Sequence, residues 1–149
     1  PVVIHDAGDG SEWTAKAVEQ AQAHGLKVLR VGEGGAFLRL IAREPGQLGQ
    51  ALQIEHEGAV RKVNLPLIGA YQAANALVAA GLALATGVPA SATFDALTRL
   101  QPVRGRLERA ALNPSGAPAY VDYAHTPDAL EAAIAALRPH VAPGGKLIV

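Results

Sequence analysis

Several features that would indicate particular functions are missing from this sequence. Its 149 residues include no cysteine, which excludes disulfides, thiolate metal sites and cysteine nucleophiles and is compatible with the cytosol. No apolar run reaches transmembrane length, and the N-terminus lacks the basic and apolar segments of a signal peptide. Methionine is also absent, and the sequence starts and stops inside apparent strands. We interpret it as a piece of a longer chain; the alternative is a processed or tag-cleaved small protein.

Charged and aromatic side chains are scarce as well. Lys+Arg and Asp+Glu number 13 each, so the balance does not point to a nucleic-acid or membrane surface as the main partner. Half of the residues are hydrophobic and 17% are charged, which is typical of a folded globular protein. The length suits one domain or slightly more. Because alanine is abundant, we expect helices that pack closely on small side chains.

The first part of the sequence has the pattern of a β-α-β unit. Apolar runs at 2–5 and 27–31 predict strands, and 11–24 predicts a helix that begins at a serine cap and has Trp13 on its apolar face. Such a unit favours parallel strands and a right-handed crossover. Gly8-Asp9-Gly10 offers the first two glycines of a dinucleotide-binding fingerprint. Trp13 occupies the place of the third, so we reject that motif.

The middle of the sequence changes to an antiparallel pattern followed by helices. Three strand-like runs, the second with alternating apolar and polar residues, lie at 37–43, 50–56 and 60–65. Glu57-Gly58 is a plausible hairpin turn between the last two. The run 70–86 predicts a helix that is apolar nearly all round and therefore buried on several sides. A second helix is predicted from Pro89 or Ser91 to Leu100.

The last part reads as a linker and the start of a second unit. Segment 101–109 combines proline, glycine and three arginines, and is our candidate interdomain linker. Strands are predicted at 107–112, 119–122 and 146–149, and a helix at 126–138. Thr126 is a good N-cap for this helix and Pro127 suits its first position. We therefore predict the α/β class, with a second β-α-β unit beginning in this region.

A few polar residues stand out as candidates for a site. Asp122 to His125 place an acid, a phenol and an imidazole between a predicted buried strand and a helix, where open α/β sheets tend to bind ligands. Gln72 and Asn75 interrupt the apolar helix; Asn75 either bonds a nearby backbone group or serves a site. Arg106, beside a glycine, either reaches an anion such as phosphate or is surface charge.

Three segments also match, in order, the motifs of one known family. They are Gly69-Ala70-Tyr71-Gln72-Ala73-Ala74-Asn75-Ala76-Leu77, Gly105-Arg106-Leu107-Glu108 and Val121-Asp122-Tyr123-Ala124-His125-Thr126-Pro127-Asp128-Ala129-Leu130. They resemble the central-domain helix start, the end of the central domain and the first turn of the C-terminal domain of the Mur ligases. The third segment is most similar to the MurE branch.

This resemblance implies a fold and an activity. Residues 1–103 would be the later part of the central ATP-binding domain. Residues 104–149 would be the linker and first β-α-β of a Rossmann-like C-terminal domain. The parent protein would be an ATP-dependent amide ligase of peptidoglycan synthesis. It would add diaminopimelate or lysine as the third amino acid to UDP-N-acetylmuramoyl-L-alanyl-D-glutamate, through an acyl phosphate that the incoming amine attacks.

The resemblance also implies site residues and partners. Asn75 would contact the adenine of ATP, Arg106 its phosphates, and Asp122 the ribose hydroxyls, while Tyr123 and His125 would shape the nucleotide pocket. Mg²⁺ would accompany ATP. The other partners would be the UDP-N-acetylmuramoyl-dipeptide and the amino-acid substrate, with no nucleic acid and no membrane. We expect a cytoplasmic monomer.

The sequence departs from the family pattern in several places. Gln72 stands where asparagine is usual, and Asp6-Ala7-Gly8-Asp9 only loosely matches an N-x-D-D stretch. The glycine-rich phosphate loop ending in G-K-T is absent, so we expect no catalytic residue and no magnesium ligand here, and no activity from this piece alone. The alternatives are another Mur-fold ligase, such as a folylpolyglutamate synthase, or a non-catalytic nucleotide-binding module. The remaining histidines match no motif and are taken as structural or surface residues: His5, His24, His56 and His140.

Overall fold

The computed structural model describes all 149 residues and contains two β-sheets. The large sheet consists of β1 (Val2–His5), β2 (Val28–Gly32), β3 (Leu38–Gly46), β4 (Gly49–His56) and β5 (Ala59–Leu65). The small sheet pairs β6 (Glu108–Leu112) with β7 (Pro118–Val121). The helices are α1 (Glu12–Ala23), α2 (Ala70–Ala85), α3 (Ala90–Leu97) and α4 (Pro127–Leu137), and the 3₁₀ turn η1 is Arg138–His140. We call β1–β5 with α1–α3 the large unit, and β6, β7, α4 and η1 the small unit.

The large sheet has the order β1-β2-β3-β4-β5 and changes from parallel to antiparallel at β3. This confirms the predicted β-α-β unit and the three antiparallel strands. β3 also pairs in parallel with β2, where Val31 lies opposite Leu38, a contact that the sequence pattern did not predict. The Glu57-Gly58 turn is confirmed, because both residues have the positive φ of 51° and 76° that a tight hairpin needs.

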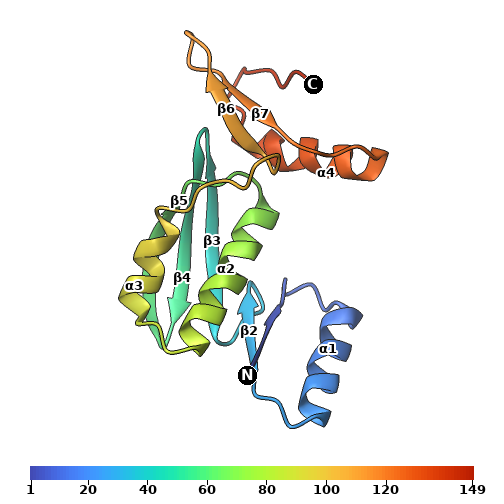
Figure 1. Ribbon diagram of the computed structural model, residues 1–149, viewed down its shortest axis with the longest axis vertical. Coiled ribbons are helices and arrows are strands. Elements are labelled where there is room, and N and C mark those ends of the chain that lie inside the picture. The colour runs from blue at the N-terminus through green and yellow to red at the C-terminus, as the bar shows by residue number, and fades with distance from the viewer.

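The main core lies between the large sheet and the helices α2 and α3, which cover one of its faces (Figure 1). The largest fully buried side chains come from the alternating strand positions and from α2: Val31, Leu38, Leu52, Ile54, Leu65 and Leu77. At Gly81 a Cβ atom would lie 2.9 Å from Val31 and 3.0 Å from Val3, so α2 approaches the parallel strands closely only because this residue is glycine.

Three predictions about burial and strands are wrong. Helix α1 buries none of its residues, and Trp13 is 81% exposed. β7 belongs to a two-stranded sheet and is not a buried strand; Val121 is 42% exposed. Residues 146–149 form no strand because they pair with none, so no second β-α-β unit closes within this chain. The apolar pattern of a segment does not show whether another element will cover or pair with that segment.

The small unit lies at one end of the large sheet, beside the β3–β4 turn and the start of α2 (Figure 1). The start of α4 is confirmed as predicted, because Thr126 Oγ1 accepts the Ala129 N–H at 3.3 Å and Pro127 occupies the first helical turn. A small apolar cluster joins the two units through Ile68, Leu107 and Ala133. None of the helices combines the length and apolar character that crossing a membrane requires.

Candidate functional site

The connection between the two units is a backbone turn at Gly105 to Glu108 whose polar groups are almost all bonded. Gly105 has φ 70° and Leu107 has φ 46°, a conformation that is costly for leucine. Gly105 N–H donates to Glu108 Oε2 at 2.9 Å, and Gly105 O accepts the Tyr123 N–H at 2.9 Å. Arg106 N–H donates to Val103 O at 2.9 Å. The turn therefore has a fixed, hydrogen-bonded conformation, and we call residues 105–108 the hinge.

Asp122 stabilises this hinge with both carboxylate oxygens. Oδ2 accepts the Leu107 N–H at 2.8 Å, and Oδ1 accepts the Ala124 N–H at 2.9 Å. The first bond supports the strained Leu107, and the second shapes the chain before α4. Because each carboxylate oxygen carries a second lone pair, the same group can still accept from a ligand hydroxyl.

Arg106 extends from the hinge into solvent. Its side chain is exposed, and its guanidinium makes no ion pair or hydrogen bond within the chain. Its backbone carbonyl, in contrast, accepts a bond from Gln72 Nε2 at 3.2 Å. The backbone of Arg106 is thus held in place, while its guanidinium remains free to bind an anion.

Tyr71 connects the hinge to helix α2. Its pKa is raised from 10.0 to about 12, mainly by burial and secondly by the Asp122 carboxylate, while the Arg106 guanidinium acts in the opposite direction. The pKa of the Tyr71 phenol therefore responds to charge on both groups. Tyr71 was part of the sequence motif but was not predicted as a site residue, and its proximity to Asp122 depends on the packing of the two units.

Asn75 lies one turn further along α2 and lines a cavity of about 460 Å³. This volume falls in the range of small-ligand pockets, roughly 300–1,000 Å³. Tyr71 and Ala74 line the same cavity, facing His5 and Arg43 from β1 and β3. Asn75 is exposed and makes no hydrogen bond within the chain, so the alternative that it bonds a backbone group is not what the structure shows.

Tyr123 and His125 lie on the other side of the hinge. The Tyr123 ring covers Gly105, where a Cβ would lie 2.6 Å from ring carbons, so this position requires glycine. His125 Nδ1 lies 2.7 Å from Tyr123 O. A carbonyl only accepts, so Nδ1 is the donor in this contact. Both side chains are exposed, and no contact joins either to Asn75.

Gln72, which replaces the usual asparagine of the motif, is 8% exposed and points to the hinge. Its amide donates to Arg106 O at 3.2 Å. The additional methylene relative to asparagine gives this side chain its reach across the junction. Gln72 therefore holds the hinge in place, and Asn75 is the only amide of the pair that faces the cavity.

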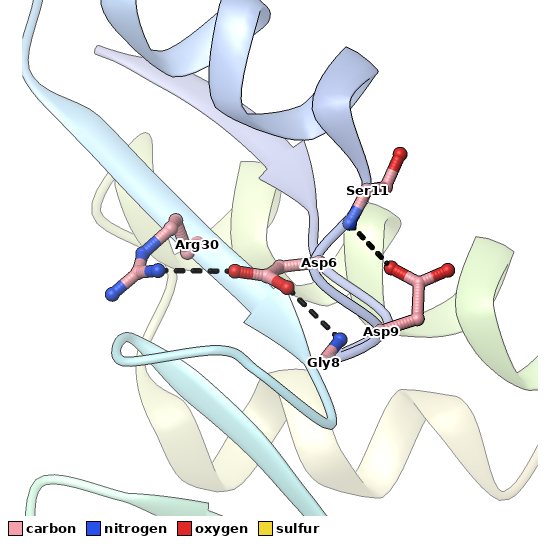
Figure 2. Close-up of polar contacts among 5 residues, drawn as sticks. All are labelled: Asp6, Gly8, Asp9, Ser11 and Arg30. Carbon is pink, nitrogen blue, oxygen red and sulfur yellow. Dashed lines mark hydrogen bonds and ion pairs between the residues drawn. The ribbon is translucent and has the colours of Figure 1, made fainter.

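The loop after β1 is closed by its own acidic side chains, as Figure 2 shows. Asp6 accepts the Gly8 N–H at 2.9 Å and pairs with Arg30 at 3.0 Å. Asp9 Oδ1 accepts the Ser11 N–H at 2.9 Å, and the Ser11 side chain forms no cap on α1, contrary to the prediction. These two carboxylates therefore stabilise the loop after β1.

Two buried polar residues were missed as important. Gln50 is 4% exposed and donates to Leu67 O and Gly69 O, both at 2.9 Å. It lies on the same strand face as Leu52 and Ile54, and a polar residue at that alternating position was the available signal. His140 is 6% exposed and bonds two backbone groups of the large unit. Its sequence surroundings gave no such signal.

Comparison with known proteins gives these residues a context. The family description "Mur ligase, glutamate ligase domain" matches residues 105–149. The UDP-N-acetylmuramoyl-L-alanyl-D-glutamate--2,6-diaminopimelate ligase of Zymomonas mobilis is 54% identical over 123 residues, which are 83% of this chain and 25% of that protein. The chain is thus similar to Mur ligases over most of its length. The ligase of the same name from Chelativorans sp. is 46% identical over all 149 residues, or 30% of its own length. The chain thus spans between a quarter and a third of these Mur ligases.

Two solved ligase structures show the same fold. MurF from Acinetobacter baumannii superposes with a TM-score of 0.76 at 24% identity, covering 93% of this chain and 29% of the other. Mycobacterium tuberculosis folylpolyglutamate synthase complexed with ADP superposes with a TM-score of 0.71 at 23% identity, covering 93% and 30%. The α/β fold class is confirmed, and at these identities the likeness concerns the fold alone.

Proposed function

We propose that the protein containing this chain is an ATP-dependent amide ligase that joins 2,6-diaminopimelate to UDP-N-acetylmuramoyl-L-alanyl-D-glutamate. The support is the name shared by the relatives that are 42–54% identical to this chain. In this reaction ATP phosphorylates the glutamate carboxylate. The amine of diaminopimelate then attacks the acyl phosphate, and the tetrahedral intermediate releases phosphate as the amide forms. We further propose that the enzyme is a cytoplasmic monomer.

Within this ligase, the chain would supply part of the nucleotide site. The observation that carries the proposal is the Arg106 guanidinium, which has no partner within the chain while the backbone carbonyl of Arg106 is held by Gln72. Arg106 would bind the phosphates as a planar cation. Asp122 would accept from the ribose hydroxyls with its remaining lone pairs, and Asn75 would hydrogen-bond adenine from the cavity. Tyr123 and His125 would border the nucleotide on the small unit.

The bond-making residues would lie elsewhere in the protein. No three His, Asp or Glu side chains gather into a metal site in this chain. Mg²⁺, when bound, neutralises charge on transferring phosphates, and we propose that its ligands lie outside residues 1–149. We likewise propose that the boundary between the two ligase domains falls at residues 103 and 104, just before the hinge.

A pair of arginine substitutions in the full-length protein tests this assignment. Arg106→Ala should raise KM for ATP roughly 10- to 100-fold, because charged hydrogen bonds contribute about 1.5–3 kcal/mol. Arg104 is an exposed arginine two residues away, and Arg104→Ala should leave KM nearly unchanged. Product is followed as amide formation together with phosphate release.

The same assay can overturn the proposal. If the full-length protein joined glutamate to a folate and not diaminopimelate to the UDP-dipeptide, the substrate assignment would be wrong. If lysine replaced diaminopimelate as the better amine, the reaction class would stand and the amino acid would change. Equal effects of the two arginine substitutions would remove Arg106 from the phosphate site.

A further inference from the structure

One buried titratable side chain at the junction of the two units has no part in the proposed nucleotide site. His140 ends η1 and is 6% exposed. Its Nδ1 lies 2.6 Å from Gly46 O, and Gly69 N–H points to its Nε2 at 3.1 Å. A carbonyl only accepts and a backbone N–H only donates, so Nδ1 carries the proton and Nε2 does not. The contacts therefore fix one neutral tautomer.

Both hydrogen-bond partners of His140 lie at the ends of secondary-structure elements in the large unit. Gly46 ends β3, and Gly69 is the N-cap of α2, the helix that carries Tyr71 and Asn75. Gly69 O accepts from Gln50 at 2.9 Å, so side chains hold this residue at both its N–H and its carbonyl. Gly69 also packs against α4, since a Cβ there would lie 3.0 Å from that of Ala136. The imidazole thus reaches the N-cap residue of the cavity-lining helix.

The rest of the junction offers few other polar contacts. Tyr120 Oη donates to Gln47 O at 3.1 Å, and Gln47 Nε2 donates to Gly116 O at 3.3 Å, both at exposed positions. Gln72 adds its single bond to the hinge. His140 is the one side chain that makes two bonds across the junction from a buried position. Loss of the imidazole would leave a buried Gly69 N–H without a partner, which is the costly case for a hydrogen bond.

We propose that His140 is a positioning residue that docks the small unit on the large unit and fixes the start of α2. Docking follows from the two bonds and the burial alone. The consequence for ATP binding rests on the proposed function, because it requires Asn75 and Tyr71 to face the nucleotide. His140 itself bonds to neither of these side chains, and its role is to hold the backbone from which they project.

Two substitutions separate hydrogen bonding from packing. His140→Phe keeps a ring of similar size and removes both bonds. His140→Gln presents a donor and an acceptor on either side of one carbon, as the imidazole does, and can serve both partners. His24→Phe is the matched control, because His24 Nδ1 also contacts a backbone carbonyl, at 2.8 Å, but at the exposed end of α1.

Trypsin cleavage at the hinge of the full-length protein reports docking directly. Arg104 and Arg106 are exposed, whereas Gly105 and Leu107 are buried, so cleavage requires the hinge to open. We expect His140→Phe to speed cleavage there roughly 10- to 100-fold, His140→Gln to stay near wild type, and His24→Phe to change nothing. Cleavage of His140→Phe at the wild-type rate would overturn the docking role, as would equal acceleration by Phe and Gln.

A kinetic measurement tests the second part of the proposal. His140→Phe should raise KM for ATP several-fold with a smaller effect on kcat, and His140→Gln should restore KM. An unchanged KM despite faster trypsin cleavage would show that docking does not position the nucleotide helix. The trypsin result needs no ATP and no ligase activity, so it decides the docking role even if the proposed reaction is wrong.

Discussion

Asp122 shows how a single carboxylate serves both the fold and the proposed site. Its two oxygens accept N–H groups from Leu107, just before β6, and Ala124, just after β7. Replacing Asp122 would therefore loosen the strained hinge and remove a proposed ribose contact together. A kinetic defect in such a variant would have two causes, which is why Arg106, whose guanidinium has no partner in the chain, is the cleaner test.

Tyr71 gives the protein a pH dependence at the alkaline end. Its pKa is raised from 10.0 to about 12, first by burial and then by Asp122. Between these two pH values an unfolded chain loses the phenolic proton and the folded chain keeps it, so folding stability falls as pH rises through this window. Below pH 10 the contribution of Tyr71 is fully present.

Tyr71→Phe tests this prediction. The variant should lose stability less steeply than wild type between pH 10 and 12, and the tyrosinate absorbance that develops near pH 12 should be smaller. Urea unfolding at a series of pH values measures the first effect, and an absorbance titration measures the second. Identical alkaline slopes in the two proteins would contradict the assignment.

The residues that the sequence could identify are those whose local pattern is unusual. Asn75, an amide on an apolar helix, and Arg106, beside a glycine, were both visible in this way. Gln72 was visible too, but its direction was not, because whether it faces the cavity or the hinge depends on the position of the small unit. His140 was invisible for the same reason, since its partners are 71 and 94 residues away.

At the scale of elements, the sequence predicted a strand or a helix start correctly where the alternation of apolar and polar residues or the capping signal was strong. The antiparallel strands followed from period-2 patterns, and the start of α4 followed from Thr126 and Pro127. The sequence patterns gave wrong predictions where no other element covers or pairs with the segment. Trp13 has the spacing of a core residue and is exposed, and residues 146–149 have the composition of a strand and no strand to pair with.

The start of α2 should be more sensitive to substitution than its end. Gly69 has φ 91° and ψ 148°, close to a region that only glycine populates freely, and Ala136 leaves no room for a Cβ. Gly87, just beyond the end of α2, has φ 92°, and a Cβ there would meet nothing within 4 Å. The two glycines thus match in φ and differ in their surroundings.

Gly69→Ala should therefore destabilise the chain by roughly 3 kcal/mol, and Gly87→Ala by about 1–2 kcal/mol. The difference reflects the contact with α4 and the bond to His140. Urea unfolding followed by circular dichroism measures both variants against wild type. A Gly69→Ala variant no less stable than Gly87→Ala would show that α4 does not pack on Gly69 in solution.

At the scale of the whole molecule, the chain contains two sides of a proposed nucleotide site without a phosphate loop. Asn75, Arg106 and Asp122 together would contact base, phosphate and ribose, but the sequence has no glycine-rich loop ending in Gly-Lys-Thr. Because phosphate contacts dominate nucleotide affinity at such loops, the 149-residue chain should bind ATP weakly, with Kd on the order of 1 mM or above.

Titration calorimetry of the 149-residue chain with ATP measures this affinity, with Arg106→Ala as the reference. Micromolar binding by the chain alone would favour the alternative of a self-sufficient nucleotide-binding module. Such binding would also mean that the cavity beside Asn75 is a complete site without the rest of the ligase.

The side-chain hydrogen bonds across the junction between the units all end on backbone groups. His140 bonds the backbones of Gly46 and Gly69, Tyr120 that of Gln47, and Gln47 that of Gly116. Since every residue presents the same backbone atoms, no pair of side chains has to change together for these hydrogen bonds to persist. Correlated substitution among relatives would therefore overlook this junction. A chimaera that exchanged its small unit for that of a relative would dock wherever the histidine, the tyrosine and the glutamine were kept.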